Sequence, residues 1–214
     1  GQIFIFWDKL FGTFQEELDA VPAVYGITRP AQTWNPIKIN FQHLWLLAKD
    51  AWRAEKWLDK LKIWFMPTGW RPEHFEEKYP VTKIEDVYHF EKYNPKHSEK
   101  LKYWSLFQLF ATLGIVSYLF ANIASIGTVE LMVYGLFVFI SIYSYSELMD
   151  TNSSALFWEI IKVGFGIGLL LYFNDWFGIS SSIYFGKEII FSYLIISLLA
   201  TLYFVSREFK SQFL

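Results

Sequence analysis

The sequence has 214 residues, of which 53% are hydrophobic and 21% aromatic, with a formal net charge of −2. This small net charge argues against nucleic acid or a strongly anionic partner. Because cysteine is absent, the chain forms no structural disulfide, zinc–thiolate site or iron–sulfur cluster. Such an abundance of aromatic residues is typical of membrane proteins, which hold them at the water–lipid interfaces.

Charged residues are concentrated in the first half of the chain. Residues 1–102 contain 15 of the 19 Lys and Arg and 14 of the 21 Asp and Glu. We therefore expect residues 1–102 to face water or lipid headgroups and residues 103–214 to form a transmembrane helical bundle. The expected fold class is mostly α: a polytopic membrane protein with interfacial amphipathic helices and about four C-terminal transmembrane helices.

The chain opens on a short apolar run, residues 1–14, which ends in a turn at Gly12-Thr13. It begins with Gly1 and has neither an initiator Met nor a basic signal region, so we expect it to be a fragment of a longer protein. Residues 15–36 are punctuated by proline and glycine, which predicts an extended loop.

Residues 37–65 show helical periodicity. One stripe comprises Phe41, Trp45, Ala48 and Trp52, and a second comprises Trp57, Leu58, Leu61, Trp64 and Phe65. Basic residues lie between these apolar positions, which predicts helices lying in the membrane surface. A soluble amphipathic pair packed on a core is the alternative. Residues 66–102, rich in proline and charge, predict a solvated loop region.

Four apolar segments follow, at about 103–127, 128–146, 155–175 and 189–206. The first lies in an uncharged run of 27 residues, longer than the ~20 residues that span a bilayer core. The third contains Glu159 and Lys162, three residues apart on one helix face. We expect these two side chains to pair and to snorkel outward. Gly164 and Gly168, four residues apart, predict close packing of the same helix.

Basic residues near the ends of the spans predict the orientation. They are Lys92, Lys96, Lys100 and Lys102 before the first span, and Arg207 and Lys210 after the last. The loops at 125–130 and 174–188 offer only Lys187. Both termini are therefore expected to be cytoplasmic, in a bacterial inner membrane or an endoplasmic reticulum. The sequon at Asn152 would then lie in the cytoplasm and be a chance match.

No metal site or catalytic constellation is predicted within the chain. The four histidines are His43, His74, His89 and His97, and no two are closer than eight residues. Paired ligands on one helix need a spacing of three or four. His43 is a weak candidate, and a surface or packing role is favoured for it over contact with metal or substrate.

The first turn of the chain carries a family resemblance. The pattern Trp-Asp-x-x-Phe-Gly-Thr-Phe resembles the segment that follows the last histidine cluster in the fatty acid hydroxylase / sterol desaturase superfamily. The matching positions are Trp7, Asp8, Phe11, Gly12, Thr13 and Phe14. A packed corner is the favoured role for this turn, and the alternative is that Asp8 orients a metal-ligand histidine.

Further stretches narrow the resemblance to the alkylglycerol monooxygenase branch. They are residues 25–30 (Tyr-Gly-Ile-Thr-Arg-Pro), 35–38 (Asn-Pro-Ile-Lys), 42–45 (Gln-His-Leu-Trp) and 67–72 (Pro-Thr-Gly-Trp-Arg-Pro). The convincing part of the resemblance covers residues 1–72, and the spans are similar to the family only in hydropathy.

The resemblance implies a membrane-bound lipid hydroxylase with a di-iron centre, in which a reduced pterin supplies electrons. The histidine boxes of that family have no counterpart here, so the metal ligands would lie upstream of Gly1 and the fragment alone would be inactive. The implied partners are the lipid bilayer and a membrane lipid substrate. A non-enzymatic four-helix membrane protein, either an anchor or a transporter subunit, is the alternative function.

Overall fold

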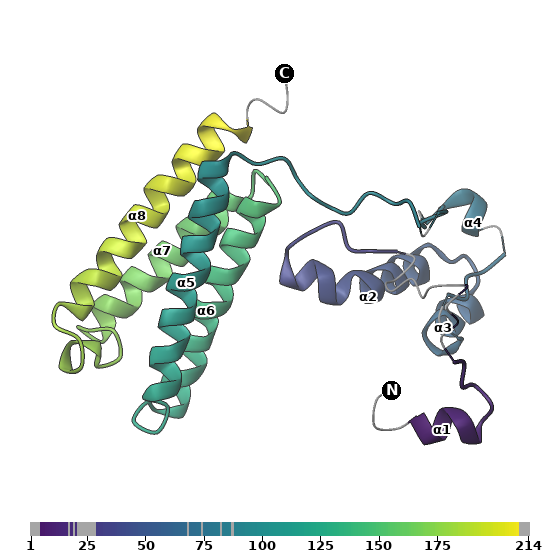
Figure 1. Cartoon of the computed structure of the whole chain (residues 1–214), viewed down its shortest axis with the longest axis horizontal. Coiled ribbons are helices and arrows are strands. Elements are labelled where there is room, and N and C mark those ends of the chain that lie inside the picture. The colour runs from purple at the N-terminus through teal and green to yellow at the C-terminus, as the bar shows by residue number, and fades with distance from the viewer. Residues whose placement is uncertain are drawn as a thin grey trace. The chain divides into compact units, whose positions relative to one another are not determined.

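A computed structural model describes residues 5–16, 18, 20, 29–67, 69–73, 75–81, 83–86 and 88–209. Gly1–Phe4, His74, Lys210 and residues 25–28, which carry part of the resemblance, lie outside these ranges. The helices are α1 (Ile5–Leu10), α2 (Pro36–Arg53), α3 (Trp57–Phe65), α4 (Phe75–Lys78), α5 (Glu99–Ala121), α6 (Thr128–Met149), α7 (Ala155–Tyr172) and α8 (Gly186–Arg207) (Figure 1). A short 3-10 turn, η1 (Ile179–Ser181), precedes α8.

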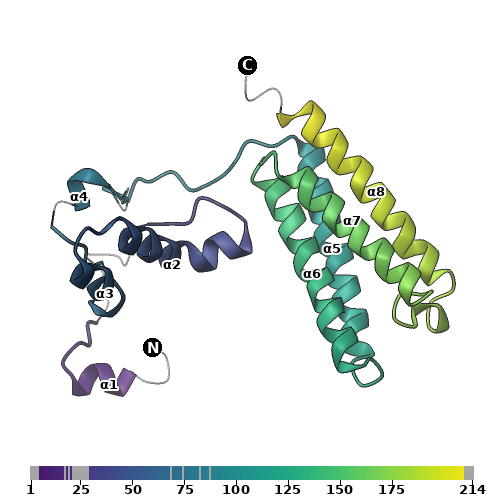
Figure 2. The same ribbon diagram turned by 180° about the vertical axis from the view of Figure 1, so that it is seen from behind.

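The chain divides into two compact units. One comprises Gly1–Pro30 with Glu73–Lys92, and the other comprises Ala31–Pro72 with Tyr93–Leu214. The second unit contains α2, α3 and the four long helices. In both views of the ribbon, α5 to α8 run side by side as a bundle (Figure 2). These mostly helical elements confirm the expected fold class.

Each helix of the bundle is long and apolar enough to cross a membrane, which confirms the prediction of about four spans. The first of these helices, α5, begins at Glu99, before the uncharged run that starts at Tyr103. Ser98 caps α5, because its hydroxyl accepts a hydrogen bond from the Leu101 backbone nitrogen at 3.1 Å. Consequently Lys102, which sequence alone assigns to the preceding loop, belongs to the first turn of a spanning helix.

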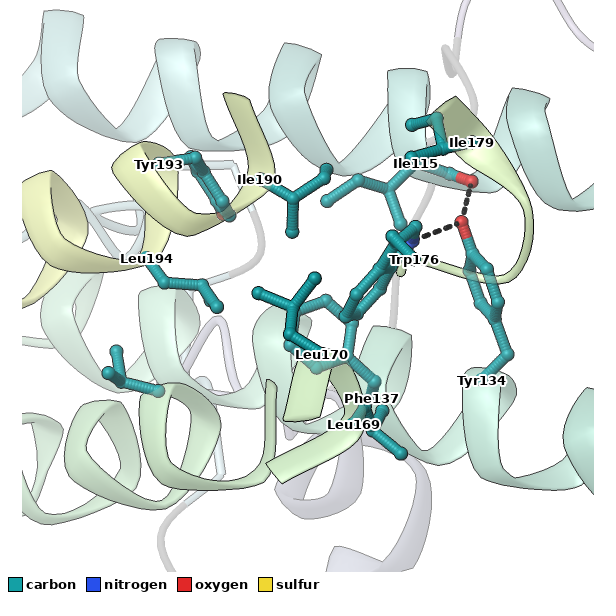
Figure 3. Packing of buried hydrophobic residues seen from close by; sticks show 11 residues of the cluster. Ile115, Tyr134, Phe137, Leu169, Leu170, Trp176, Ile179, Ile190, Tyr193 and Leu194 are labelled. Carbon is teal, nitrogen blue, oxygen red and sulfur yellow. Dashed lines mark hydrogen bonds between the residues drawn. The ribbon is translucent and has the colours of Figure 1, made fainter. Parts of the chain in front are cut away.

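Trp176, from the loop between α7 and α8, is fully buried in the apolar core of the bundle (Figure 3). Its indole nitrogen donates to the Tyr134 hydroxyl at 3.1 Å, and that hydroxyl donates to the Ile115 carbonyl oxygen at 2.7 Å. The Trp176 ring also meets Phe137 edge-on, with centroids 4.7 Å apart. The Trp176 ring, whose indole nitrogen is hydrogen-bonded, therefore connects the loop to α6 and, through Tyr134, to α5.

The charged pair in α7 points into the bundle. Glu159 and Lys162 form an ion pair of 2.6 Å, as predicted, but both side chains are only 1% exposed. The expectation that they snorkel outward is wrong. Glu159 accepts hydrogen bonds from Ser144 of α6 at 2.6 Å and from Ser197 of α8 at 2.5 Å. These partners offset the cost of burying charge.

Ser197 links this pair to a second polar group. Its oxygen accepts from Lys162 at 2.6 Å and from the Gln108 amide of α5 at 2.5 Å. Tyr193 donates in turn to the Gln108 side-chain oxygen at 2.6 Å. The hydrogen-bonded cluster thus includes side chains from all four helices of the bundle.

Close helix packing on α7 occurs at Gly166. A Cβ added there would lie 2.8 Å from Leu194 of α8 and 2.8 Å from the Phe137 ring of α6. A Cβ at Gly164 or Gly168 would meet nothing within 4 Å. The prediction of close packing at Gly164 and Gly168 is therefore wrong, because those two glycines lie on another face of the helix.

The two helices α2 and α3 expose the aromatic stripes that their sequence predicted. The most exposed rings are Trp52, 87% exposed, and Phe65, 85% exposed. Arg71 anchors the turn after α3, because its guanidinium forms two hydrogen bonds, of 2.7 and 2.9 Å, with the buried Asp50 carboxylate of α2. This forked geometry suits an arginine–carboxylate pair.

Candidate functional site

The family-like turn at residues 7–14 is organised by Asp8. Its backbone oxygen accepts hydrogen bonds from the backbone nitrogens of Thr13, at 2.8 Å, and Phe14, at 3.0 Å. The Thr13 hydroxyl donates to the Asp8 carboxylate at 3.3 Å. Gly12 has a φ of +68°, a conformation that glycine adopts without the strain of a side chain.

The aromatic rings of this turn lie at its surface. Trp7 stacks on Phe11 with centroids 5.9 Å apart, whereas Phe14 lies beneath the Lys9 ammonium, 5.0 Å from ring centre to nitrogen. Trp7, Phe11 and Phe14 are all exposed. The turn is therefore formed by local hydrogen bonds, and its rings are available to contact other parts of the protein.

The histidines lie in unrelated surroundings. His43 is exposed on α2. His89 pairs with Asp86 at 2.9 Å on the surface, and His97 contacts the Met149 carbonyl oxygen. Among the described residues, no three His, Asp or Glu side chains come together as metal ligands. This part of the chain therefore does not fit the donor set of a di-iron centre.

Glu147 lies at the centre of a polar joint, which we define as Thr33–Lys38 at the start of α2 together with Glu147–Ser154, the end of α6 and the turn that leads to α7. The Glu147 carboxylate accepts from the Asn35 amide nitrogen at 2.5 Å and pairs with Lys38 at 2.9 Å. Its other oxygen accepts from Asn152 at 2.7 Å and from Ser154 at 2.5 Å. A buried carboxylate is thereby fully hydrogen-bonded.

Asp150 completes the polar joint. Its carboxylate accepts from the Trp34 backbone nitrogen at 2.7 Å, the Thr33 hydroxyl and the Tyr93 hydroxyl, the last at 3.0 Å. Burial raises the pKa of Tyr93 above its ordinary value, and the nearby Asp150 carboxylate raises it further. Tyr93 therefore remains a hydrogen-bond donor at physiological pH.

Sequence reasoning missed this joint. Glu147 and Asp150 follow the second apolar span, and a carboxylate at the end of a span usually interacts with water or headgroups. Asn35, Pro36 and Lys38 belong to a stretch that resembles the alkylglycerol monooxygenase branch. The one signal available was Asn35-Pro36, because Asn before Pro at the start of a periodic segment marks a helix cap. Glu147, the hydrogen-bond partner of Asn35, lies 112 residues away, so no local sequence pattern indicates the contact.

A groove of about 460 Å³ lies beside the polar joint, between α5 and α6. Its apolar walls are formed by Leu101, Leu106 and Leu109 of α5 and by Ile142, Tyr145 and Met149 of α6. Trp34, His97 and Lys102 line it as well. The volume lies within the range of about 300–1,000 Å³ that is usual for small-molecule sites.

Comparison with known proteins connects the chain with one group of enzymes. It is 29% identical to human alkylglycerol monooxygenase over 164 residues, which is 75% of this chain and 36% of that protein. It is 26% identical to the Xenopus tropicalis alkylglycerol monooxygenase over 74% of this chain and 35% of that protein. A Caenorhabditis elegans alkylglycerol monooxygenase is 36% identical over 81 residues, 34% of this chain and 16% of that protein.

The chain spans about a third of the length of the curated relatives it matches. Three quarters of 214 residues is about 160, and only 102 residues precede the first uncharged run. The similarity therefore continues into the apolar helices, which corrects the view that they resemble the family only in hydropathy. No family model matches the chain, and no solved structure matches it.

Proposed function

We propose that this chain is the C-terminal, membrane-embedded part of a lipid monooxygenase similar to alkylglycerol monooxygenases. The supporting observation is that the similarity to the human enzyme covers 75% of the chain and so includes part of the four-helix region. A lipid-processing enzyme needs access to substrate dissolved in the bilayer, and four helices suited to crossing it meet that need.

The proposed reaction inserts one oxygen atom of O₂ into a C–H bond beside the ether oxygen of an alkylglycerol. The second oxygen atom leaves as water, with two electrons and two protons supplied by a reduced pterin. The resulting hemiacetal breaks into a fatty aldehyde and glycerol.

The described residues do not fit an iron centre. Under this proposal the di-iron ligands come from sequence upstream of Gly1. The residues of this chain instead hold the start of α2 against the bundle, through Asn35 and Lys38 on Glu147. The exposed rings of α2 and α3 would lie in the headgroup region, where Trp is favoured.

The test is expression of the full-length protein in membranes, supplied with 1-O-alkylglycerol, O₂ and reduced pterin. We expect fatty aldehyde whose formation requires all three. The isolated 214-residue chain, purified in detergent, should contain well under one iron per molecule. Folded full-length protein that forms no aldehyde and contains no iron would favour the non-enzymatic four-helix protein.

A further inference from the structure

The groove between α5 and α6 opens toward the surroundings of the bundle. Leu106 and Leu109, which line it, are 47% and 40% exposed. Both lie within a helix long and apolar enough to span a membrane, so their exposed sides face hydrocarbon. A hydrocarbon chain therefore suits this side of the groove better than a water-soluble molecule does.

The shape of the groove suits such a chain. From Leu101 to Leu109 the groove follows two turns of α5, about 12 Å at the usual rise per residue. The opposite wall is formed by Ile142, Tyr145 and Met149 of α6. A long slot between two helices accommodates one extended alkyl or acyl chain.

The end of the groove near the start of α5 is basic. Residues 96–102 contain three lysines and one glutamate, a net charge of +2 with His97 neutral. Lys102 lines the groove and pairs with Glu99 at 2.6 Å, but both side chains are more than half exposed. An exposed pair of this kind is weak, so the Lys102 ammonium is able to bind another anion.

The carboxylates other than Glu99 near this end of the groove have partners of their own, and Glu208 accepts from the Ser98 hydroxyl at 2.5 Å. Glu147 and Asp150 do not line the groove, and both are already bonded within the polar joint. Trp34 closes the same end of the groove, and an indole is favoured at the level of lipid headgroups.

We propose that this groove binds one chain of an anionic phospholipid, with the lipid phosphate on Lys102. The occupant is a lipid of the surrounding bilayer, selected by a basic headgroup site at one end and an apolar slot below it. This assignment does not depend on the enzymatic function proposed above, because it rests on the groove and its charge alone.

The test uses photoreactive phosphatidylglycerol and phosphatidylcholine with the full-length protein in nanodiscs, followed by mass spectrometry of the labelled peptides. We expect phosphatidylglycerol to label peptides of α5 and α6, with phosphatidylcholine labelling them far less. Lys102→Gln should reduce the preference for phosphatidylglycerol about fivefold, the effect of losing one basic residue near a membrane surface. Lys187→Gln is the control, because Lys187 lies in the first turn of α8 and does not line the groove.

A second pair of variants tests the slot. Leu106→Trp should fill the groove and abolish labelling, whereas Leu113→Trp should leave it unchanged. Leu113 is 50% exposed on the same helix and lies outside the groove. Equal labelling by both phospholipids, equal effects of the two Trp variants, or displacement of phosphatidylglycerol by uncharged alkylglycerol would overturn the proposal.

Discussion

Asn35 makes hydrogen bonds in two directions from one short side chain. Its oxygen accepts from the backbone nitrogens of Ile37 and Lys38, at 2.9 and 3.1 Å, and so caps α2. Its amide nitrogen donates to Glu147 of α6. Because both ends of the amide are used, Asp could cap the helix but could not donate to the carboxylate.

Asn35→Ala is expected to destabilise the protein by about 1–2 kcal/mol, since a lost helix cap costs that much. The backbone amides of Ile37 and Lys38 should also exchange with deuterium faster. Thermal unfolding and hydrogen-exchange mass spectrometry of the full-length protein measure both effects. The matched control is Asn40→Ala, because Asn40 is exposed and donates only within α2, to Pro36. Equal loss in the two variants would contradict the role of Asn35.

Asp8 supports the family-like turn mainly through its backbone oxygen, which a side-chain substitution leaves in place. Asp8→Asn keeps an oxygen that accepts from Thr13, so we expect normal expression and normal activity per folded molecule. Turnover and iron content of the full-length enzyme check this. A fall of about 10–100-fold with intact folding would instead show that Asp8 orients a metal ligand.

Helix α7 contains one tightly packed glycine, Gly166, and two glycines that meet nothing within 4 Å, Gly164 and Gly168. Gly166→Ala should destabilise the bundle, because the new methyl group would meet Leu194 and the Phe137 ring at 2.8 Å. Overpacking of this kind costs about 1–3 kcal/mol, partly offset by the better helix propensity of Ala. Gly164→Ala and Gly168→Ala meet open space and should be neutral or stabilising. Denaturation in detergent ranks the three variants, and a reversed order would contradict the packing.

Lys162→Met leaves the Glu159 carboxylate buried without its ion-pair partner. We expect a loss of about 3–5 kcal/mol, the scale for breaking a buried pair. The double variant Glu159→Gln with Lys162→Met should recover much of it, because a glutamine remains able to bond Ser144 and Ser197. Lys187→Met, in the first turn of α8, serves as the control, because its ammonium bonds the exposed Asn174. A single variant as stable as the control would contradict a structural role for the pair.

The spans were predictable because each is a continuous apolar run, a property of neighbouring residues alone. The direction in which Glu159 and Lys162 point was not predictable, because the sequence of one helix does not reveal which neighbouring helices cover each of its faces. Their partners Ser144 and Ser197 lie on other helices. The same reason explains Gly166. It lies midway between Gly164 and Gly168 in the sequence, and only the positions of α6 and α8 show that Gly166 is the closely packed one.

For the whole molecule, the lysine cluster around the start of α5 and Arg207 at the end of α8 predict that both termini are cytoplasmic. Reporter fusions after Lys100, Gly127, Asn152, Ser181 and Leu214 should therefore report inside, outside, inside, outside, inside. Asn152 should stay unglycosylated in a eukaryotic membrane, and its amide is already bonded to Glu147. An outside signal or a glycan at Asn152 would contradict this topology.

The polar joint also sets an order of events during synthesis. Asn35 leaves the ribosome 112 residues before Glu147, a delay of about 5–20 s at the usual rate of translation. During that interval α2 exists without its partner, and its exposed aromatic face is free to settle on the membrane first. Closure of the joint must then follow synthesis of α5 and α6, so α2 is held in place only after both helices have been made.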